Sequence, residues 1–112
     1  MYLEHVSLPG DITKVRLIGS LDIAGSGKID APFAAIVAKS DRVIIDFAQV
    51  SFLASIGIRL LVKAARAISG RGGKIAVYNL NSDARKVLKS TGIDAIIPTL
   101  TDEAAAVAEC SK

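Results

Sequence analysis

The stretch IIDFAQVSFLASIGIRLLV, residues 44–62, decides the fold of this chain. From Arg42 to Phe47 the sequence is apolar without alternation, which is typical of a strand buried on both faces. From Ile56 to Ile68 the apolar residues leave one polar stripe: Ser55, Arg59, Lys63 and Arg66. At about 100° per residue these positions lie within roughly 80° of one another, on one face of a helix. The stretch therefore predicts a strand, a short linker and a helix that begins near Ser55.

Ser55 has two interpretations at this position. A serine at a helix start can accept hydrogen bonds from the free backbone N–H groups of the first turn, as an N-cap. The same place lies at the positive end of the helix dipole, which stabilises a negative group. Ser55 is therefore either a plain cap or a site where an anionic group is held, with Arg59 one turn below it.

The rest of the chain alternates strands and helices after an initial hairpin. Turn residues at 9–11 join a weak strand to an alternating one, and both are expected to be antiparallel. The predicted strands are at 3–8, 13–18, 42–47, 74–80 and 95–98, and residues 21–23 end the second strand. The predicted helices are at 30–39, 55–69, 82–91 and 102–109. Ser82 and Thr101 are expected as helix caps, and Pro32 is expected in the first turn of its helix.

This order predicts an α/β sandwich in a single domain over residues 1–112. We expect a mixed sheet of about five strands, mostly parallel, with about four helices. Short crossovers place the loops that follow the strands on one rim. Asp22, the turn at 52–57 and residues 79–81 are expected to meet there.

The segment Gly25-Ser26-Gly27-Lys28 carries part of a phosphate-binding loop. The full motif needs a glycine at the position of Asp22 and a hydroxyl at the position of Ile29. Both are missing, so we interpret the segment as a flexible loop that leads into a helix.

The turn Ala54-Ser55-Ile56-Gly57 resembles the signature of the STAS domain, which is shared by sulphate transporters and bacterial anti-sigma-factor antagonists. Soluble members of that family usually have Asp-Ser-Ser-Gly or Asp-Ser-Thr-Gly there. Ser55 and Gly57 match this pattern, whereas Ala54 replaces the aspartate and Ile56 the second hydroxyl. Three further elements match in order and spacing: Gly19-Ser20-Leu21-Asp22, Gly72-Gly73-Lys74 and Ser90-Thr91-Gly92-Ile93.

The resemblance implies a STAS-like fold and a regulatory partner-switching protein in transcription signalling. By this resemblance Ser55 is the phosphoacceptor, the partner is an anti-sigma factor with serine kinase activity, and a serine phosphatase is left open as a second partner. The expected interface is Asp22, Phe52, Leu53, Ala54, Ile56, Gly57, Arg59 and Lys63. The alternative is a STAS subunit of a transporter-associated or multi-protein signalling complex that is not phosphorylated, which the apolar Ala54 and Ile56 favour.

Composition narrows the function classes. The sequence has no run of about 18 apolar residues, so we expect no membrane span. The N-terminus lacks the pattern of a signal peptide. A single cysteine favours a reducing cytoplasm. The net charge of +3 raises nucleic acid as a partner, but only five aromatics are present and no dense basic cluster exists, so we expect none.

No catalytic constellation can be assembled, so we expect no enzyme, no metal and no cofactor. His5 stands alone near the N-terminus, without a second histidine or a thiol partner. Asp46 is expected to accept hydrogen bonds from backbone N–H groups of the following loop rather than to act in chemistry. Cys110 is expected to be an inert or frayed terminal residue.

Overall fold

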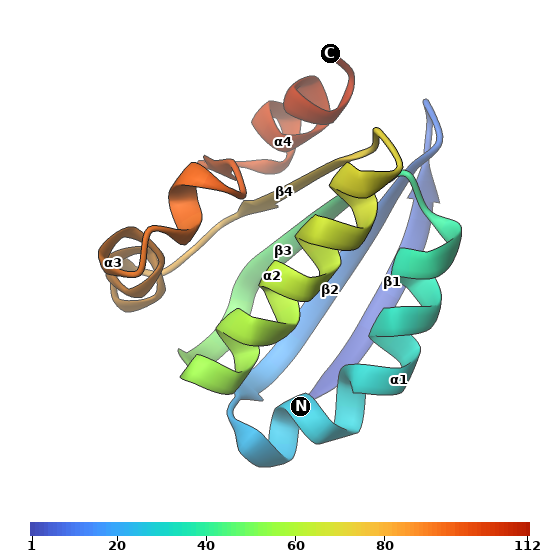
Figure 1. Ribbon diagram of the computed structural model, residues 1–112. Coiled ribbons are helices and arrows are strands. Elements are labelled where there is room, and N and C mark those ends of the chain that lie inside the picture. Colours follow the sequence, from blue (N-terminus) through green and yellow to red (C-terminus); the bar gives the residue numbers. More distant parts are fainter.

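The computed structural model describes residues 1–112, which form five strands and four α-helices. The elements in chain order are β1 (Tyr2–Leu8), β2 (Ile12–Leu21), α1 (Ile23–Lys39), β3 (Arg42–Leu53), α2 (Ser55–Gly70), β4 (Lys74–Tyr78), α3 (Ser82–Ser90), the 3₁₀ helix η1 (Ile93–Ala95), β5 (Thr99–Leu100) and α4 (Glu103–Cys110). Figure 1 shows α1 and α2 side by side in front of the sheet.

The strands form one sheet in the order β1-β2-β3-β4-β5. β1 and β2 are an antiparallel hairpin, and every other neighbouring pair is parallel. This confirms the predicted mixed sheet with a parallel majority. β3 lies at its centre, and its residues Val43, Ile44 and Ile45 are fully buried because both faces of the sheet are covered there.

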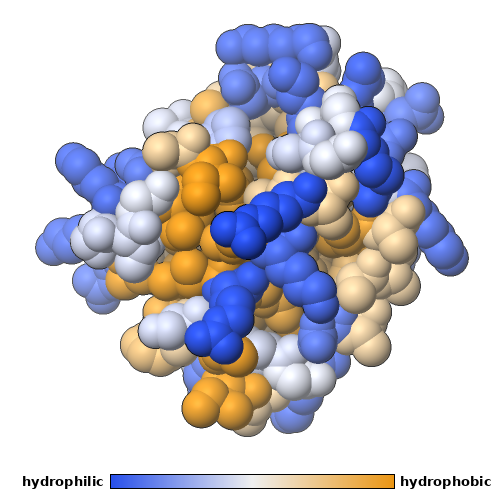
Figure 2. All heavy atoms as spheres, viewed as in Figure 1, coloured by the Kyte–Doolittle hydropathy of each residue, from blue (hydrophilic) through white to orange (hydrophobic).

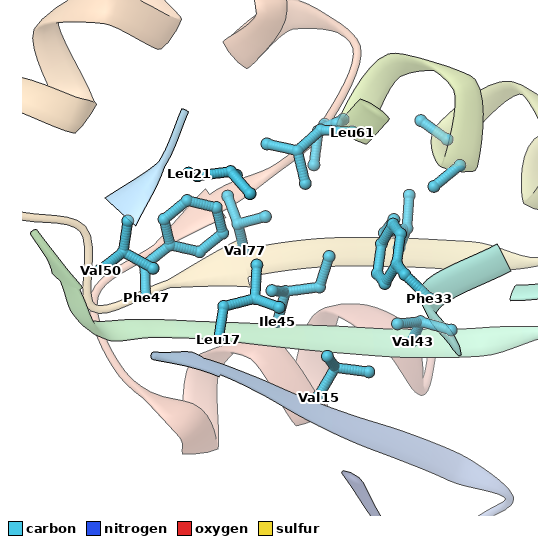
Figure 3. Packing of buried hydrophobic residues seen from close by; sticks show 14 of the residues in the cluster. Val15, Leu17, Leu21, Phe33, Val43, Ile45, Phe47, Val50, Leu61 and Val77 are labelled. Carbon is cyan, nitrogen blue, oxygen red and sulfur yellow. The ribbon is translucent and has the colours of Figure 1, made fainter. Parts of the chain in front are cut away.

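The larger of two hydrophobic clusters fills the space between the sheet and helices α1, α2 and α3. Figure 3 shows Leu61 of α2 above Val77 and Ile45 of the sheet, and Phe33 of α1 beside them, next to Val43. A smaller cluster joins Ile44, Ala76 and Tyr78 on the opposite face to Ala106 and Cys110 of α4. The sheet is therefore the middle layer of a sandwich, as predicted.

The glycine-rich segment at 25–28 is helical, so the predicted flexible loop is wrong. Asp22 caps α1 by accepting a hydrogen bond from the backbone N–H of Gly25 at 2.8 Å, and the helix begins at Ile23. Gly25 lies so close to the Ser20 carbonyl that a Cβ atom would overlap it. Glycine is therefore required there by packing rather than by flexibility. Pro32 consequently lies inside α1 and not in its first turn.

The central strand is longer than predicted and leaves almost no linker before α2. Val50 and Leu53 are buried, and residues up to Leu53 stay paired with β2, so β3 extends to that residue. Near the C-terminus, the predicted strand at 95–98 is wrong: residues 93–95 form η1, and β5 contains only Thr99 and Leu100.

Two predicted helix caps are displaced by one residue. Asn81, not Ser82, caps α3 by accepting from the N–H of Ala84 at 2.8 Å, and Asp102, not Thr101, caps α4 through Ala105 at the same distance. In each case the neighbouring residue places a side-chain oxygen opposite the third N–H of the helix.

Candidate interaction site at the start of helix α2

The Ser55 turn lies where the carboxyl ends of β2 and β3 meet the start of α2. The N–H of Ala54 donates to the Leu21 carbonyl at 3.0 Å, which ties the turn to the end of β2. Gly57 also packs closely against Leu21, because a Cβ atom at position 57 would lie 2.5 Å from Leu21 Cγ. Asp22 follows Leu21 directly, so the predicted rim with Asp22 and the turn is present.

Ser55 is the exposed first residue of α2 and does not cap it, so the interpretation of Ser55 as a plain cap is wrong. The N-cap is Ala54, whose backbone is extended and whose side chain has no oxygen to offer. The α-helices α1, α3 and α4 each have a side-chain cap, and α2 has none. The first turn of α2 also lacks an acidic side chain. The first backbone N–H groups of α2 and the positive end of its dipole therefore lie at Ser55 without a side-chain acceptor.

The residues expected at the interface differ in exposure. Phe52 is 58% exposed, and Ser55, Arg59 and Lys63 are exposed along one side of α2. Asp22, Ala54 and Ile56 are half-buried.

Two of the expected interface residues belong to the core instead. Leu53 is only 6% exposed because it is the last residue of β3 that points into the main cluster. Gly57 is buried against Leu21. Neither offers a side chain to a partner, and both instead hold the turn in place.

Ile23 is an apolar surface residue of this site that the sequence analysis missed. It is 80% exposed at the first position of α1. With Ile56, Arg59 and Lys63 it lines a hollow of about 260 Å³ between α1 and α2. Figure 2 views this side of the molecule and shows hydrophilic side chains crossing an apolar surface. An isoleucine directly after the capping Asp22 was the feature of the sequence that could have indicated this exposed position.

Asn79 and Asn81, expected at the same rim, make structural contacts. Asn81 caps α3 and donates to the Val50 carbonyl at 3.3 Å. Asn79, with a φ of 60°, donates to Asp46 Oδ1 at 3.2 Å.

Asp46 has the backbone role that the sequence predicted. Its Oδ1 accepts from the N–H of Ala48 at 2.8 Å, and Arg16 Nε lies 3.9 Å from Oδ2. Burial, with the negative charge of Asp46 as a second cause, raises the pKa of the adjacent Tyr78. These groups stabilise the sheet away from Ser55.

His5 is exposed on the edge strand β1. Cys110 is fully buried, and burial raises the pKa of its thiol to about 11, so it is an unreactive core residue rather than a frayed one. None of the helices combines the length and apolar character needed to cross a bilayer.

Comparison with known families assigns the chain to one of them. The STAS domain model matches residues 5–106, most of the chain. The chain belongs to the STAS domain family. The matched range includes both the Asp22 and Ser55 segments of the rim.

Individual relatives agree with this family. The chain is 27% identical over 93 residues to BtrV of Bordetella bronchiseptica, provisionally named an anti-sigma factor antagonist, covering 82% of this chain and 80% of BtrV. The fold of the present chain is similar to that of an anti-sigma factor antagonist from Mycobacterium paratuberculosis (TM-score 0.86, 19% identity, 99% and 96% of the two chains). It is also similar to the phosphorylated form of the Bacillus cell fate determinant SpoIIAA (TM-score 0.73, 22% identity, 96% and 98%).

Proposed function

We propose that this STAS domain is an anti-sigma-factor antagonist that binds an anti-sigma factor with serine kinase activity and is released when Ser55 is phosphorylated. The uncapped start of α2 is the observation that carries the proposal. It presents an exposed hydroxyl where the helix can stabilise a phosphate, and no neighbouring side chain competes for the N–H groups. BtrV, provisionally named an anti-sigma factor antagonist, and the similarly folded Mycobacterium protein of that name support the antagonist part of this proposal.

The surface around Ser55 suits a partner that is partly apolar and partly acidic. Phe52 and Ile23 are the exposed apolar groups, and Arg59 and Lys63 add two positive charges without a carboxylate within 4.0 Å. Apolar anchors surrounded by charges are common in protein interfaces, where the charges steer association.

Phosphorylation would reverse this complementarity. The kinase would transfer the terminal phosphoryl group of its nucleoside triphosphate to Ser55 Oγ, adding about −1.5 to −2 charges and three acceptor oxygens. Arg59, one turn further along the helix, would be drawn to the phosphate and away from an acidic partner group. The partner surface that fits the hydroxyl would then meet a negative charge, and the complex would dissociate.

The test is to measure binding to the cognate kinase for wild type, Ser55→Ala and Ser55→Asp. We expect Ser55→Ala to bind within about threefold of wild type and Ser55→Asp at least tenfold more weakly, about 1.4 kcal/mol. Ser82→Asp, which adds the same charge at the exposed start of α3, is the matched control and should bind like wild type. Equal affinity of wild type and Ser55→Asp would refute the switch.

The apolar turn favours one second candidate. Ala54 and Ile56 lack the carboxylate and hydroxyl of the usual turn and fit a constitutive subunit of a larger complex, in which Ser55 is never modified. Peptide mapping of the protein from its own cells separates the two, since phosphate on Ser55 would exclude the constitutive subunit.

A further inference from the structure

A polar hollow of about 650 Å³ lies at the end of the sheet opposite to Ser55. It is formed where β2, β3 and β4 begin, between the β1–β2 hairpin and the loop from α2 to β4. These two connections lie near the upper edge of Figure 1. Ser55 follows the carboxyl end of β3, so the two sites are separated by the length of that strand.

Positive charge is concentrated in this hollow. Five cationic residues line it: Lys39, Arg42, Arg71, Lys74 and Lys112. Only two acidic residues, Asp11 and Asp41, share it. The chain has 14 cationic and 11 acidic side chains, so nine of each remain elsewhere and balance. The formal excess of positive charge therefore belongs to this one concave surface.

Three of the cations have structural partners. Arg71 binds Asp41 at 3.1 Å and the carbonyls of Val37 and Ser40 at 2.7 and 2.6 Å, which closes the end of α1. Arg42 donates to the Gly10 carbonyl at 2.9 Å, and Lys112 pairs with Glu109 at 2.9 Å.

Lys39 and Lys74 remain as free charges. Both are exposed, and neither has a carboxylate within the 4.0 Å of an ion pair. The N–H groups of residues 71–73 already donate to the carbonyls of Ile68 and Ser69, so a ligand would be held by side chains. A cleft lined by one sign of charge focuses its field and concentrates ions of the opposite sign.

We propose that this hollow binds a small ligand with two or more phosphate-type charges, held by Lys39 and Lys74. The volume is that of a small-molecule site, for which about 300–1,000 Å³ is usual. Only two of its 14 lining residues are hydrophobic, so an acidic protein segment would find few apolar contacts to bury. A compact polyanion does not need apolar contacts, because its charges interact directly with the lysines.

The experiment is calorimetric titration of the intact protein with inorganic tripolyphosphate at low and moderate salt. The test variant is Lys39→Gln/Lys74→Gln, and the matched control is Lys28→Gln/Lys89→Gln. Both pairs remove two positive charges from exposed lysines, and Lys39 and Lys89 each lie in the last turn of a helix. We expect at least a tenfold rise in Kd for the test pair and less than a threefold rise for the control.

The proposal is overturned if wild type shows no saturable binding, or if both pairs weaken binding equally. Tighter competition by a glutamate-rich peptide than by tripolyphosphate would also overturn it, in favour of an acidic protein partner. Thermal melts of each variant establish that it is folded. Ser55→Asp should bind tripolyphosphate like wild type, so this result does not depend on the proposed switch.

Discussion

Gly57 lies where helix α2 comes closest to the end of strand β2. A Cβ atom at this position would be 2.5 Å from Leu21 Cγ, 2.8 Å from Cδ2 and 3.0 Å from the Leu21 carbonyl oxygen. Leu21 is fully buried and cannot move aside without disturbing the main cluster. The glycine therefore sets how near the Ser55 turn lies to Asp22.

Gly57→Ala should lower the free energy of unfolding by about 1–3 kcal/mol, because the added methyl group overpacks this contact. Urea unfolding followed by circular dichroism measures it. Gly27→Ala is the control, since a Cβ atom there meets nothing within 4 Å and α1 should gain up to about 1 kcal/mol. Equal shifts for the two variants would contradict the prediction.

At the scale of the element, the cap decides where α1 begins. Asp22 accepts from the Gly25 N–H, and the helix then runs through two glycines that would otherwise favour a loop. Asp22 also lies on the rim beside Ser55. A measurement of folding stability alone therefore isolates its role as a helix cap from any contact with a partner.

Asp22→Ala should lower the free energy of unfolding by about 1 kcal/mol through loss of the cap. Asp22→Asn keeps a side-chain oxygen in place and should stay close to wild type in the same urea experiment. If Asp22→Asn destabilises the protein as much as Asp22→Ala, the hydrogen bond to Gly25 is not the cause.

At the scale of the whole molecule, α4 closes the second face of the sheet. Cys110, the last residue of α4, is fully buried against the sheet, with its thiol 3.7 Å from the Val43 carbonyl. Burial, followed by the negative charge of Glu109, raises the pKa of this thiol from 9.0 to about 11. The packing of this helix is therefore linked to the protonation of Cys110.

The folded protein holds the Cys110 proton up to about pH 11, whereas the unfolded chain releases it near pH 9.0. The stabilisation is complete below pH 9.0 and is lost as the pH rises towards 11, because the unfolded state then binds fewer protons. Urea unfolding at pH 8 and pH 10.5 should show a smaller decline for Cys110→Ala than for wild type. An identical decline would contradict this linkage.

The sequence by itself determined the hairpin, the buried central strand and the polar stripe of α2. These features depend on hydrophobic periodicity and turn residues, which are local. It also identified the turn at Ser55 and its order relative to Asp22, because short motifs keep their spacing in the chain.

Only the tertiary structure decided what each residue of that turn presents. Leu53 is buried and Ile23 exposed because the length of β3 and the start of α1 depend on pairing with β2 and on the cap at Asp22. The hollow with Lys39 and Lys74 likewise depends on the parallel sheet, which gathers the beginnings of distant strands at one edge. Contacts between residues far apart in the chain leave no periodic signal, so the surfaces that they create appear only when the chain is folded.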